Sequence, residues 1–232
     1  MKAAIMQPYL FPYIGYFQLM NFVDKFTIYD DVNYITRGWI NRNNILVNGR
    51  ECMFTVPLKN ASRSTLIKDL ELCDTEKWVK KFLKTVKHSY SKAPYFDEIS
   101  SVVAEVVSTR SKFIKDWHLK SFELINNYLD IKTDIIESST IYNNMEFKGQ
   151  YRILDICLKE NIDHYINPIG GLKLYDRELF KKNEIEISYL KEEVTRYNQF
   201  KSKFVSCLSI IDVMMFNGKE ITSKMLKNFN LV

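Results

Sequence analysis

Short apolar runs and helical patterns alternate along the chain and predict a parallel β-sheet. The run at 3–6 has the apolar character of a buried strand, and Gln7-Pro8 ends it because proline lacks the N–H donor that a central strand needs. Apolar side chains then recur at helical spacing over 14–23, and a second strand pattern at 25–29 ends on Asp30-Asp31. A right-handed crossover makes the two strands of such a unit parallel.

Further strand and helix patterns extend this alternation. We expect strands at 131–136, 162–166 and 185–190, and helices at 151–160 and 175–182. Five strands separated by helices indicate a single α/β domain over residues 1–232, with a doubly wound, mostly parallel, Rossmann-like (HUP-like) sheet. A three-layer sandwich with two sheets is the alternative.

Two segments interrupt the alternation and predict insertions. Asn48-Gly49 suits the two-residue type I′ turn of a β-hairpin, and an alternating pattern at 66–72 predicts a third, edge strand. A hairpin insertion therefore occupies about 33–72. Helical patterns fill a second insertion at about 75–128, with a joint between helices at 108–111.

The C-terminal tail predicts two short helices. The first covers 209–216 and ends at Asn217-Gly218, because glycine readily takes the left-handed conformation that closes a helix. The second is expected at 221–229.

Composition and charge narrow the class of protein. Of the 232 residues, 46% are hydrophobic, which is enough to bury an ordinary core. The net charge of +5 favours an acidic partner, a description that fits nucleotide sugars, acyl carrier proteins, nucleic acids and membrane surfaces. No basic tract resembles a dedicated nucleic-acid arm, and no apolar run reaches the length of a membrane span or leader. We therefore expect a cytoplasmic protein without membrane insertion.

The cysteines and histidines predict no metal site. The four cysteines lack C-x-x-C spacing, and the three histidines lack H-x-x-x-H pairing. Cys52, Cys157 and Cys207 lie in apolar patterns that predict inert burial, and Cys73 has no obvious activating base.

Several strings along the chain are similar to a known family. They are QPYLFPYIGYFQL, YDDVNY, GWINRNNI, KHSYSKAPYF, YINPIGGLKLYD, YNQF and LSIIDVMMFNG, in this order. Together they resemble the WbqC-like family over nearly the whole chain. Members of that family are associated with O-antigen (lipopolysaccharide) and other surface-polysaccharide gene sets. The resemblance implies a transferase that adds an acyl or aminoacyl (glycyl-like) group to the amine of a nucleotide-linked amino sugar.

The first strand–helix–strand unit has a weaker likeness to the nucleotidylyltransferase/HUP group. That group carries H-x-G-H at the start of its first helix, where this chain has Tyr13-Ile14-Gly15-Tyr16. Neutral tyrosine donates a hydrogen bond but supplies no positive charge to a transferring phosphate, so the departure argues against nucleotidyl transfer. The helix N-terminus still offers free N–H groups to an anion.

Polar residues at the ends of the first two strands are candidates for the site, because ligands of open α/β sheets bind beyond the carboxyl ends of the strands. Gln7, Tyr9 and Tyr16 would line a sugar or nucleotide pocket, or else cover the sheet as aromatic residues commonly do. One carboxylate of Asp30 and Asp31 would accept a proton from an attacking amine or hold a cationic or hydroxyl group. The alternative is a strand-end cap in a polar turn.

The segment that follows holds the densest polar cluster, formed by Trp39, Asn41, Arg42 and Asn43. Arginine binds phosphate in a fixed fork, and tryptophan stacks on a base or sugar. This cluster is predicted to hold the diphosphate of a nucleotide sugar, and a solvated loop leading into the hairpin is the alternative.

A second cluster, Lys87, His88 and Tyr90, precedes a proline break. His88 is a candidate general base because the unperturbed pKa of histidine lies near neutrality, although a lone histidine is more often structural. The base is therefore sought among His88, Asp30 and Asp31. His118 and His164 lie on helical and strand patterns and are interpreted as packing or surface residues.

Two loops after later strands complete the predicted site. Gly170 and Gly171 would let the backbone approach a ligand closely, with Tyr175 beside it. Tyr197 and Gln199 offer an amide and aromatic loop after the last strand. Neither loop has the pattern of a P-loop.

Three functional hypotheses follow. The first is N-acyl or aminoacyl transfer to a nucleotide-linked amino sugar, with a donor among carrier-protein thioesters, coenzyme A thioesters, aminoacyl-tRNA, or ATP plus an amino acid. The second is nucleotidyl transfer or acyl adenylation in the first strand–helix–strand unit. The third is a non-catalytic nucleotide-sugar-binding protein.

Overall fold

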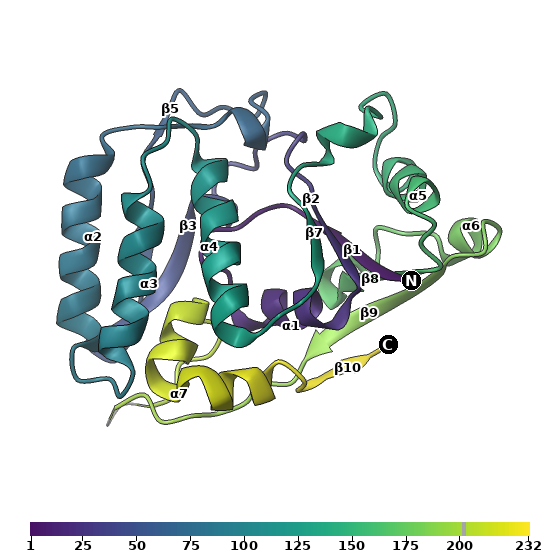
Figure 1. The fold of residues 1–232 in the computed structure, drawn as a ribbon. Coiled ribbons are helices and arrows are strands. Elements are labelled where there is room, and N and C mark those ends of the chain that lie inside the picture. Colours follow the sequence, from purple (N-terminus) through teal and green to yellow (C-terminus); the bar gives the residue numbers. More distant parts are fainter. Residues whose placement is uncertain (201–202) are drawn as a thin grey trace.

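A six-stranded mixed sheet forms the centre of the fold in the computed structural model, which describes residues 1–200 and 203–232 (Figure 1). Its order is β10-β9-β8-β1-β2-β7; β10 is antiparallel to β9, and the other neighbouring pairs are parallel. The strands are β1 (Lys2–Met6), β2 (Lys25–Ile28), β7 (Asp134–Ile136), β8 (His164–Pro168), β9 (Glu186–Glu192) and β10 (Phe229–Leu231).

The sheet corrects two of the sequence predictions. All five predicted strands are present, but the sheet has a sixth strand and is mixed, so a five-stranded doubly wound layout is not confirmed. The helix predicted at 221–229 is confirmed only over its first part, because the helical part of α7 (Ile210–Met225) that follows the kink at Gly218 ends at Met225 and β10 begins at Phe229. β10 pairs with the backbone groups of β9 that a free edge strand would leave open.

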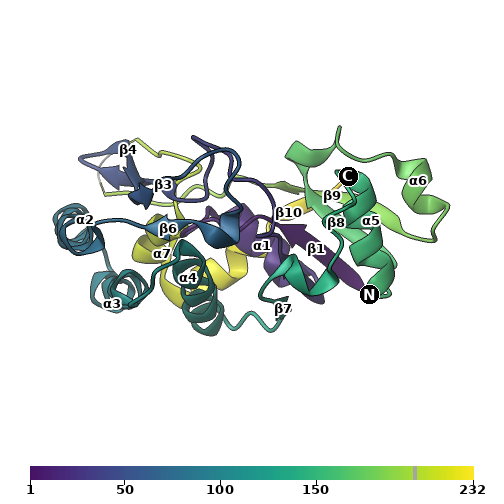
Figure 2. The same cartoon turned by 90° about the horizontal axis from the view of Figure 1, so that it is seen from above.

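Helices cover both faces of the sheet (Figure 2). Side chains of α1 (Ile14–Phe22), α4 (Ile114–Leu129) and α7 belong to one core cluster, and those of α5 (Gln150–Lys159) and α6 (Arg177–Lys181) belong to a second. Ala4 contributes to the first cluster and Ala3 and Ile5 to the second, as alternation along a buried strand requires. None of the described helices is both long and apolar enough to cross a bilayer.

A hairpin and two further helices extend the first core beyond the carboxyl ends of the strands. The hairpin consists of β3 (Arg42–Val47) and β4 (Arg50–Thr55), and its turn residues Asn48 and Gly49 both have the positive φ that a type I′ turn requires. Helices α2 (Thr75–Tyr90) and α3 (Phe96–Ser108) stand beside α4, as Figure 1 shows, so the predicted joint near 108–111 is confirmed.

One smaller prediction in these segments needs correction. The strand expected at 66–72 is a 3₁₀ turn (Ile67–Asp69) followed by the two-residue β6 (Glu71–Leu72), which pairs with β5 (Leu58–Lys59). Further 3₁₀ turns lie at Ser139–Tyr142 and Ile169–Gly171.

The break predicted at Asn217-Gly218 is present, because α7 consists of two helical parts that meet at a kink at Gly218. Gly218 has a φ of 61°, and a Cβ on it would come within 2.4 Å of the Tyr95 ring. Both the conformation and the close packing require glycine at this position.

A buried histidine links α4 to the loop before the hairpin. The side chain of His118 is 0% exposed, and its Nε2 lies 2.8 Å from the carbonyl oxygen of Ile40, so the neutral ring donates this hydrogen bond. Its Nδ1 is buried without a hydrogen-bond partner among the described residues. Burial lowers the pKa of His118 to about 4. The interpretation of His118 as a packing residue is confirmed, and it fixes the backbone beside Trp39.

His118 should make stability depend on pH. Its pKa is about 4 in the folded chain and 6.5 in the unfolded chain, so the unfolded state binds more protons between these values. Its contribution is therefore lost as the pH falls from 6.5 toward 4, and at pH 4 the free energy of unfolding should be lower by roughly 3 kcal/mol. Urea unfolding of the wild type and of His118→Phe across this range measures the effect. Parallel pH curves for the two proteins would contradict it.

Candidate functional site

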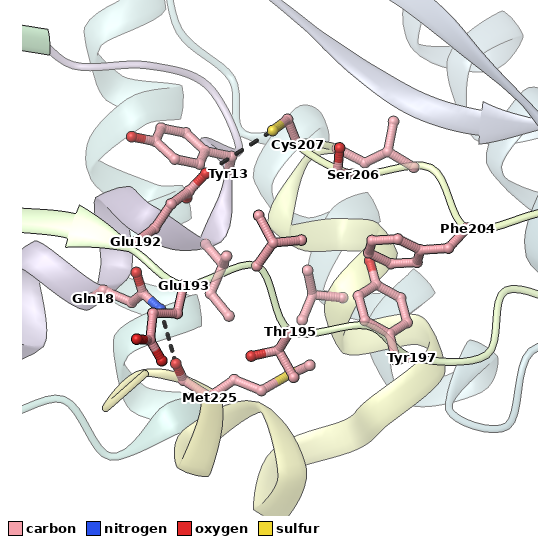
Figure 3. Close-up of a pocket in the computed structure, with 14 residues that line it drawn as sticks. Tyr13, Gln18, Glu192, Glu193, Thr195, Tyr197, Phe204, Ser206, Cys207 and Met225 are labelled. Atoms are coloured by element: carbon pink, nitrogen blue, oxygen red, sulfur yellow. Dashed lines mark hydrogen bonds between the residues drawn. The ribbon is translucent and has the colours of Figure 1, made fainter. Parts of the chain in front are cut away.

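The candidate site is a pocket beyond the carboxyl ends of β1 and β9. Its volume is ≈ 280 Å³, near the lower end of the range of roughly 300–1,000 Å³ that is typical of small-molecule sites. It is lined by Tyr9, Pro12, Tyr13, Trp39, Asn43, Glu192 and Cys207. A narrower pocket of ≈ 40 Å³ adjoins it and shares Tyr13, Glu192 and Cys207 (Figure 3).

Hydrogen bonds to one loop bring these distant segments together. Asn43 in β3 donates from Nδ2 to the carbonyl oxygen of Phe11 at 2.7 Å, and Ser209, the residue before α7, donates from Oγ to the same oxygen at 2.7 Å. The backbone N–H of Ser209 donates to Asn44, and that of Ile210 donates to Pro12. The loop after β1, the start of β3 and the start of α7 are therefore fixed to one another around the pocket.

Glu192 is the acidic group of this pocket. Its side chain is partly exposed, but Oε2 is buried and has no hydrogen-bond partner in the described part of the chain. Burial raises the pKa of Glu192, so its carboxylate is a stronger base than an exposed one. Gly15 makes room for this arrangement, because a Cβ there would come within 2.4 Å of the Tyr13 ring and 2.7 Å of Glu192 Oε2.

Cys207 lies beside Glu192. Its Sγ is 3.9 Å from Glu192 Oε1, and Figure 3 shows the thiol directed toward that carboxylate. The residue is exposed and has a φ of 58°, a region in which non-glycine residues are strained. Strained backbone conformations are common at functional sites, where the surrounding structure holds them in place. Here the hydrogen bond from Ser209 to Phe11 fixes the chain two residues after Cys207.

The prediction that the cysteines in apolar patterns are buried is wrong for two of them. Cys207 and Cys52 are exposed, because each lies in an irregular or outward-facing part of the chain rather than in the core. Cys157 is buried, as predicted, and burial raises its pKa to about 12.

Three of the predicted site residues meet in the pocket: Tyr9, Trp39 and Asn43. Trp39 is 43% exposed, so part of its indole is accessible to a ligand. The guanidinium of Arg42 lies 5.7 Å from the Trp39 ring centre, and its Nε donates to the carbonyl oxygen of Gly38 at 2.7 Å. Aromatic, amide and cationic groups are therefore adjacent at the mouth of the pocket.

Other predicted site residues of these segments do not line the pocket but form hydrogen bonds within the protein. Asn41 is buried; it accepts a hydrogen bond from Tyr34 and donates one to the carbonyl oxygen of Val56. Tyr16 is 1% exposed, stacks on Phe122 and donates to the carbonyl oxygen of Gln7 at 3.1 Å. None of Asn41, Tyr16 and Gln7 lines the pocket.

Asp30 and Asp31 occupy a different part of the carboxyl edge. Each is 1% exposed. Ser138 donates to Asp30 at 2.7 Å, and the hydroxyl of Ser139 donates to Asp31. Arg152 of α5 forms an ion pair with Asp31 at 2.5 Å. Burial raises the pKa of Asp30, but the hydrogen bonds and the ion pair tie both carboxylates to the turn after β7 and to α5.

Tyr90, Tyr197 and Gln199 converge on Asp212 rather than on the large pocket. Their side chains donate to its carboxylate at 2.9, 2.6 and 2.7 Å, and Asp212 is 0% exposed. Tyr90 also accepts a hydrogen bond from the backbone N–H of Leu46 in β3. This network attaches the segment after β9 to α7 and the hairpin, and Tyr197 lines the narrow pocket as well.

The predicted glycine loop follows β8 and forms its own polar cluster. A Cβ on Gly171 would lie 2.0 Å from Oδ1 of Asn167, so the close approach predicted for this loop is to a side chain of the protein itself. Tyr175 and Tyr165 form a hydrogen bond of 3.0 Å, and burial raises the pKa of Tyr175 to about 12. Gly170 has open space around it.

Lys87 and His88 are exposed at the far end of β3 from the pocket. His88 lines a separate pocket with Asn48 and Gly49 of the hairpin turn. Asn48 lies five positions after Asn43 along the extended hairpin strand, which corresponds to roughly 15 Å. His88 is therefore distant from the carboxylate and thiol of the candidate site.

Sequence reasoning did not select Tyr13, Glu192 and Cys207 for the site. Glu192 had a usable signal, because it lies two residues after the strand predicted at 185–190, at the edge where ligands of parallel sheets bind. Cys207 had none, because its position beside Glu192 depends on the tertiary contacts of Ser209.

Comparisons with known proteins agree with the sequence resemblance. The profile of the WbqC-like protein family matches residues 7–224. A curated relative from Mycobacterium tuberculosis, called uncharacterized protein Rv1507c, is 29% identical over 227 residues, which cover 94% of this chain and 95% of the relative. No solved structure matches the chain. The likeness of the first unit to the nucleotidylyltransferase/HUP group is not confirmed by these matches.

Arg152→Ala should test whether Asp31 is held as a structural ion pair. The substitution leaves a buried carboxylate without its cation, so the free energy of unfolding should fall by about 3–5 kcal/mol. Lys219→Ala, which removes an exposed ion pair with Asp130, is the control and should cost less than about 1 kcal/mol. Urea unfolding measures both. A loss for Arg152→Ala no larger than that of the control would show that Asp31 does not depend on this partner.

Proposed function

The chain belongs to the WbqC-like protein family, and on this basis we propose that it transfers an acyl or aminoacyl group to the amine of a nucleotide-linked amino sugar. This activity would serve the synthesis of a surface polysaccharide such as O-antigen. The observation that carries the proposal is the pocket in which an exposed tryptophan and a tyrosine face a carboxylate and a thiol.

The pocket volume suits a sugar ring better than a whole nucleotide sugar. The sugar would therefore enter the pocket, and the diphosphate and base would extend over Trp39 and Arg42 at its mouth. Of the three guanidinium nitrogens of Arg42, only Nε forms a hydrogen bond with another described residue. Its two terminal nitrogens therefore remain for phosphate oxygens. Trp39 offers the accessible part of its indole to the base or sugar by stacking.

Glu192 is the proposed general base. An amine must lose a proton as it attacks an acyl carbon, and burial raises the pKa of Glu192, which makes its carboxylate a better acceptor of that proton than an exposed one. Oε2 lacks a partner among the described residues, and an ammonium or amine of the substrate would supply one. This role replaces the ones proposed for His88, Asp30 and Asp31, because the first is distant and the others are held by partners of their own.

Cys207 provides a covalent route for the acyl group when the donor is a thioester. Glu192 accepts the thiol proton, the Cys207 sulfur attacks the acyl carbon, and the carbon–sulfur bond of the donor breaks. The proton then passes to the donor thiolate, which leaves as a free thiol. The amine of the sugar next attacks the acyl–Cys207 thioester, an amide forms, and Cys207 recovers its proton.

Nucleotidyl transfer has less support as a function. Of the two tyrosines at the histidine positions of that group, Tyr16 lies in the core against Phe122, and only Tyr13 lines the pocket. Neither supplies a positive charge for a transferring phosphate.

The proposed activity is tested by incubating the protein with nucleotide-linked amino sugars and each class of donor. Mass spectrometry should detect an acyl-sized gain on the sugar. Glu192→Gln should lower kcat by about 10²–10⁴-fold, as expected for loss of a general base. The acidic limb of the wild-type pH profile should lie above 4.5, the ordinary pKa of glutamate. Glu186→Gln, at the exposed start of the same strand, is the matched control. No gain with any donor would overturn the proposed function.

The covalent step makes a separate prediction about the two exposed cysteines. Incubation with a thioester donor, without any amine acceptor, should add one acyl group to the wild type and to Cys52→Ser, but none to Cys207→Ser. Intact-protein mass spectrometry measures the addition. An acyl group on Cys207→Ser, or amide formation at an unchanged rate by that variant, would contradict the covalent route.

A further inference from the structure

The net charge of the protein is concentrated on one helix. Residues 75–92, which comprise α2 and the two residues after it, hold six lysines and one glutamate, a net charge of +5. The whole chain has 33 Lys+Arg and 28 Asp+Glu, so the remaining residues carry 27 of each and are neutral overall. The basic character of the protein is therefore a local property of α2.

The lysines of α2 form a continuous exposed surface, which we call the lysine face. Spacings of three and four residues put them on one side of the helix, and all five are exposed. The lysine face consists of Lys77, Lys80, Lys81, Lys84 and Lys87. In the described part of the chain, none of the five forms an ion pair with a carboxylate.

The opposite side of α2 fixes this face rigidly. Phe82, Val86 and Tyr90 are buried in the first core cluster, and the indole N–H of Trp78 donates to the carbonyl oxygen of Thr55 at 2.7 Å. Like charges held this close repel one another, so the arrangement costs stability unless a partner neutralises it. An oppositely charged partner removes that repulsion.

We infer that the lysine face binds an acidic helix of a small carrier protein that delivers the acyl group. The face follows a straight helix for about 15 Å from Lys77 to Lys87, which matches a second helix lying alongside it. The identification of the partner as an acyl carrier rests on the proposed function, whereas its acidic helical character rests on the charge and shape of α2.

The composition of the face favours a protein over a nucleic acid. It contains no arginine, the residue whose fork binds phosphate in two places. Trp78 packs inward, so α2 offers no exposed aromatic ring on which a base would stack. Lysines on flexible stems act as point charges, and they suit carboxylates spread along a helix.

The C-terminal end of α2 adjoins the hairpin turn and the segment between β9 and α7. His88, Ser91 and Lys92 line a pocket of ≈ 300 Å³ together with the hairpin turn and Phe200. Phe200 belongs to the segment between β9 and α7 that carries Cys207. The end of α2 that carries the lysine face therefore adjoins a pocket that the segment holding Cys207 helps to line.

The test measures binding of purified acyl carrier protein by calorimetry. The triple variant Lys77→Glu/Lys80→Glu/Lys84→Glu should weaken Kd by at least about tenfold, and wild-type affinity should fall steeply between about 50 and about 300 mM salt. Lys181→Glu/Lys182→Glu/Lys227→Glu makes the same change of charge at exposed lysines away from α2, and should change Kd by less than about threefold. Circular dichroism and thermal unfolding confirm that both variants are folded.

Three results would overturn the inference: no binding of the carrier protein, equal weakening by the control variant, or tighter binding of transfer RNA that the lysine-face variant abolishes. Turnover with a small thioester such as acyl-coenzyme A separates this inference from the proposed function. Turnover with the small donor but no carrier binding removes the docking surface alone. Carrier binding without amide formation from any donor retains the surface and removes the transferase.

Discussion

The carbonyl oxygen of Phe11 is the point on which the candidate site depends. It accepts hydrogen bonds from Asn43 and Ser209, which lie on segments far apart in the sequence. Phe11 has a φ of 46°, an unfavourable conformation for a bulky residue, and these two bonds help to offset its cost. Together with the backbone hydrogen bonds of Ser209 to Asn44 and of Ile210 to Pro12, they fix the loop after β1 to the hairpin and to α7. The Phe11 carbonyl is therefore a shared acceptor for two of the segments that surround the pocket.

The carboxylates of Asp31 and Glu192, both at the carboxyl edge of the sheet, differ in how many of their oxygens have partners. Asp31 has an arginine and a hydroxyl as partners, as a buried carboxylate requires, and its contacts hold α5 against the turn after β7. Glu192 has one buried oxygen that lacks a partner in the described chain, and its pKa is raised by burial. A buried carboxylate oxygen without a hydrogen-bond partner favours binding of a ligand that supplies one. A carboxylate whose hydrogen bonds are all made within the protein stabilises the fold instead.

The sequence predicted the general location of the site better than its chemistry. Tyr9 and the Trp39 segment were found because proline breaks and strand ends are local signals, and the edge of a parallel sheet brings strand ends together. The hairpin turn at Asn48-Gly49 was found for the same local reason. His88 was predicted to be the general base only because the unperturbed pKa of histidine lies near neutrality. In the structure, the length of β3 separates His88 from the candidate site. The position of Cys207 depends on contacts between distant segments, which no local pattern encodes.

The strings that carry the family resemblance meet in pairs within the fold. QPYLFPYIGYFQL meets GWINRNNI at the Phe11 carbonyl, and KHSYSKAPYF and YNQF both meet LSIIDVMMFNG at Asp212. These pairs build the framework around the pocket, so a residue in a family string is not for that reason a ligand of the substrate. Tyr90 and Gln199 illustrate the point, because both hold Asp212 at the base of the segment that carries Cys207. The side chains that this framework leaves open to the pocket include Glu192 and Cys207, which lie beside each other.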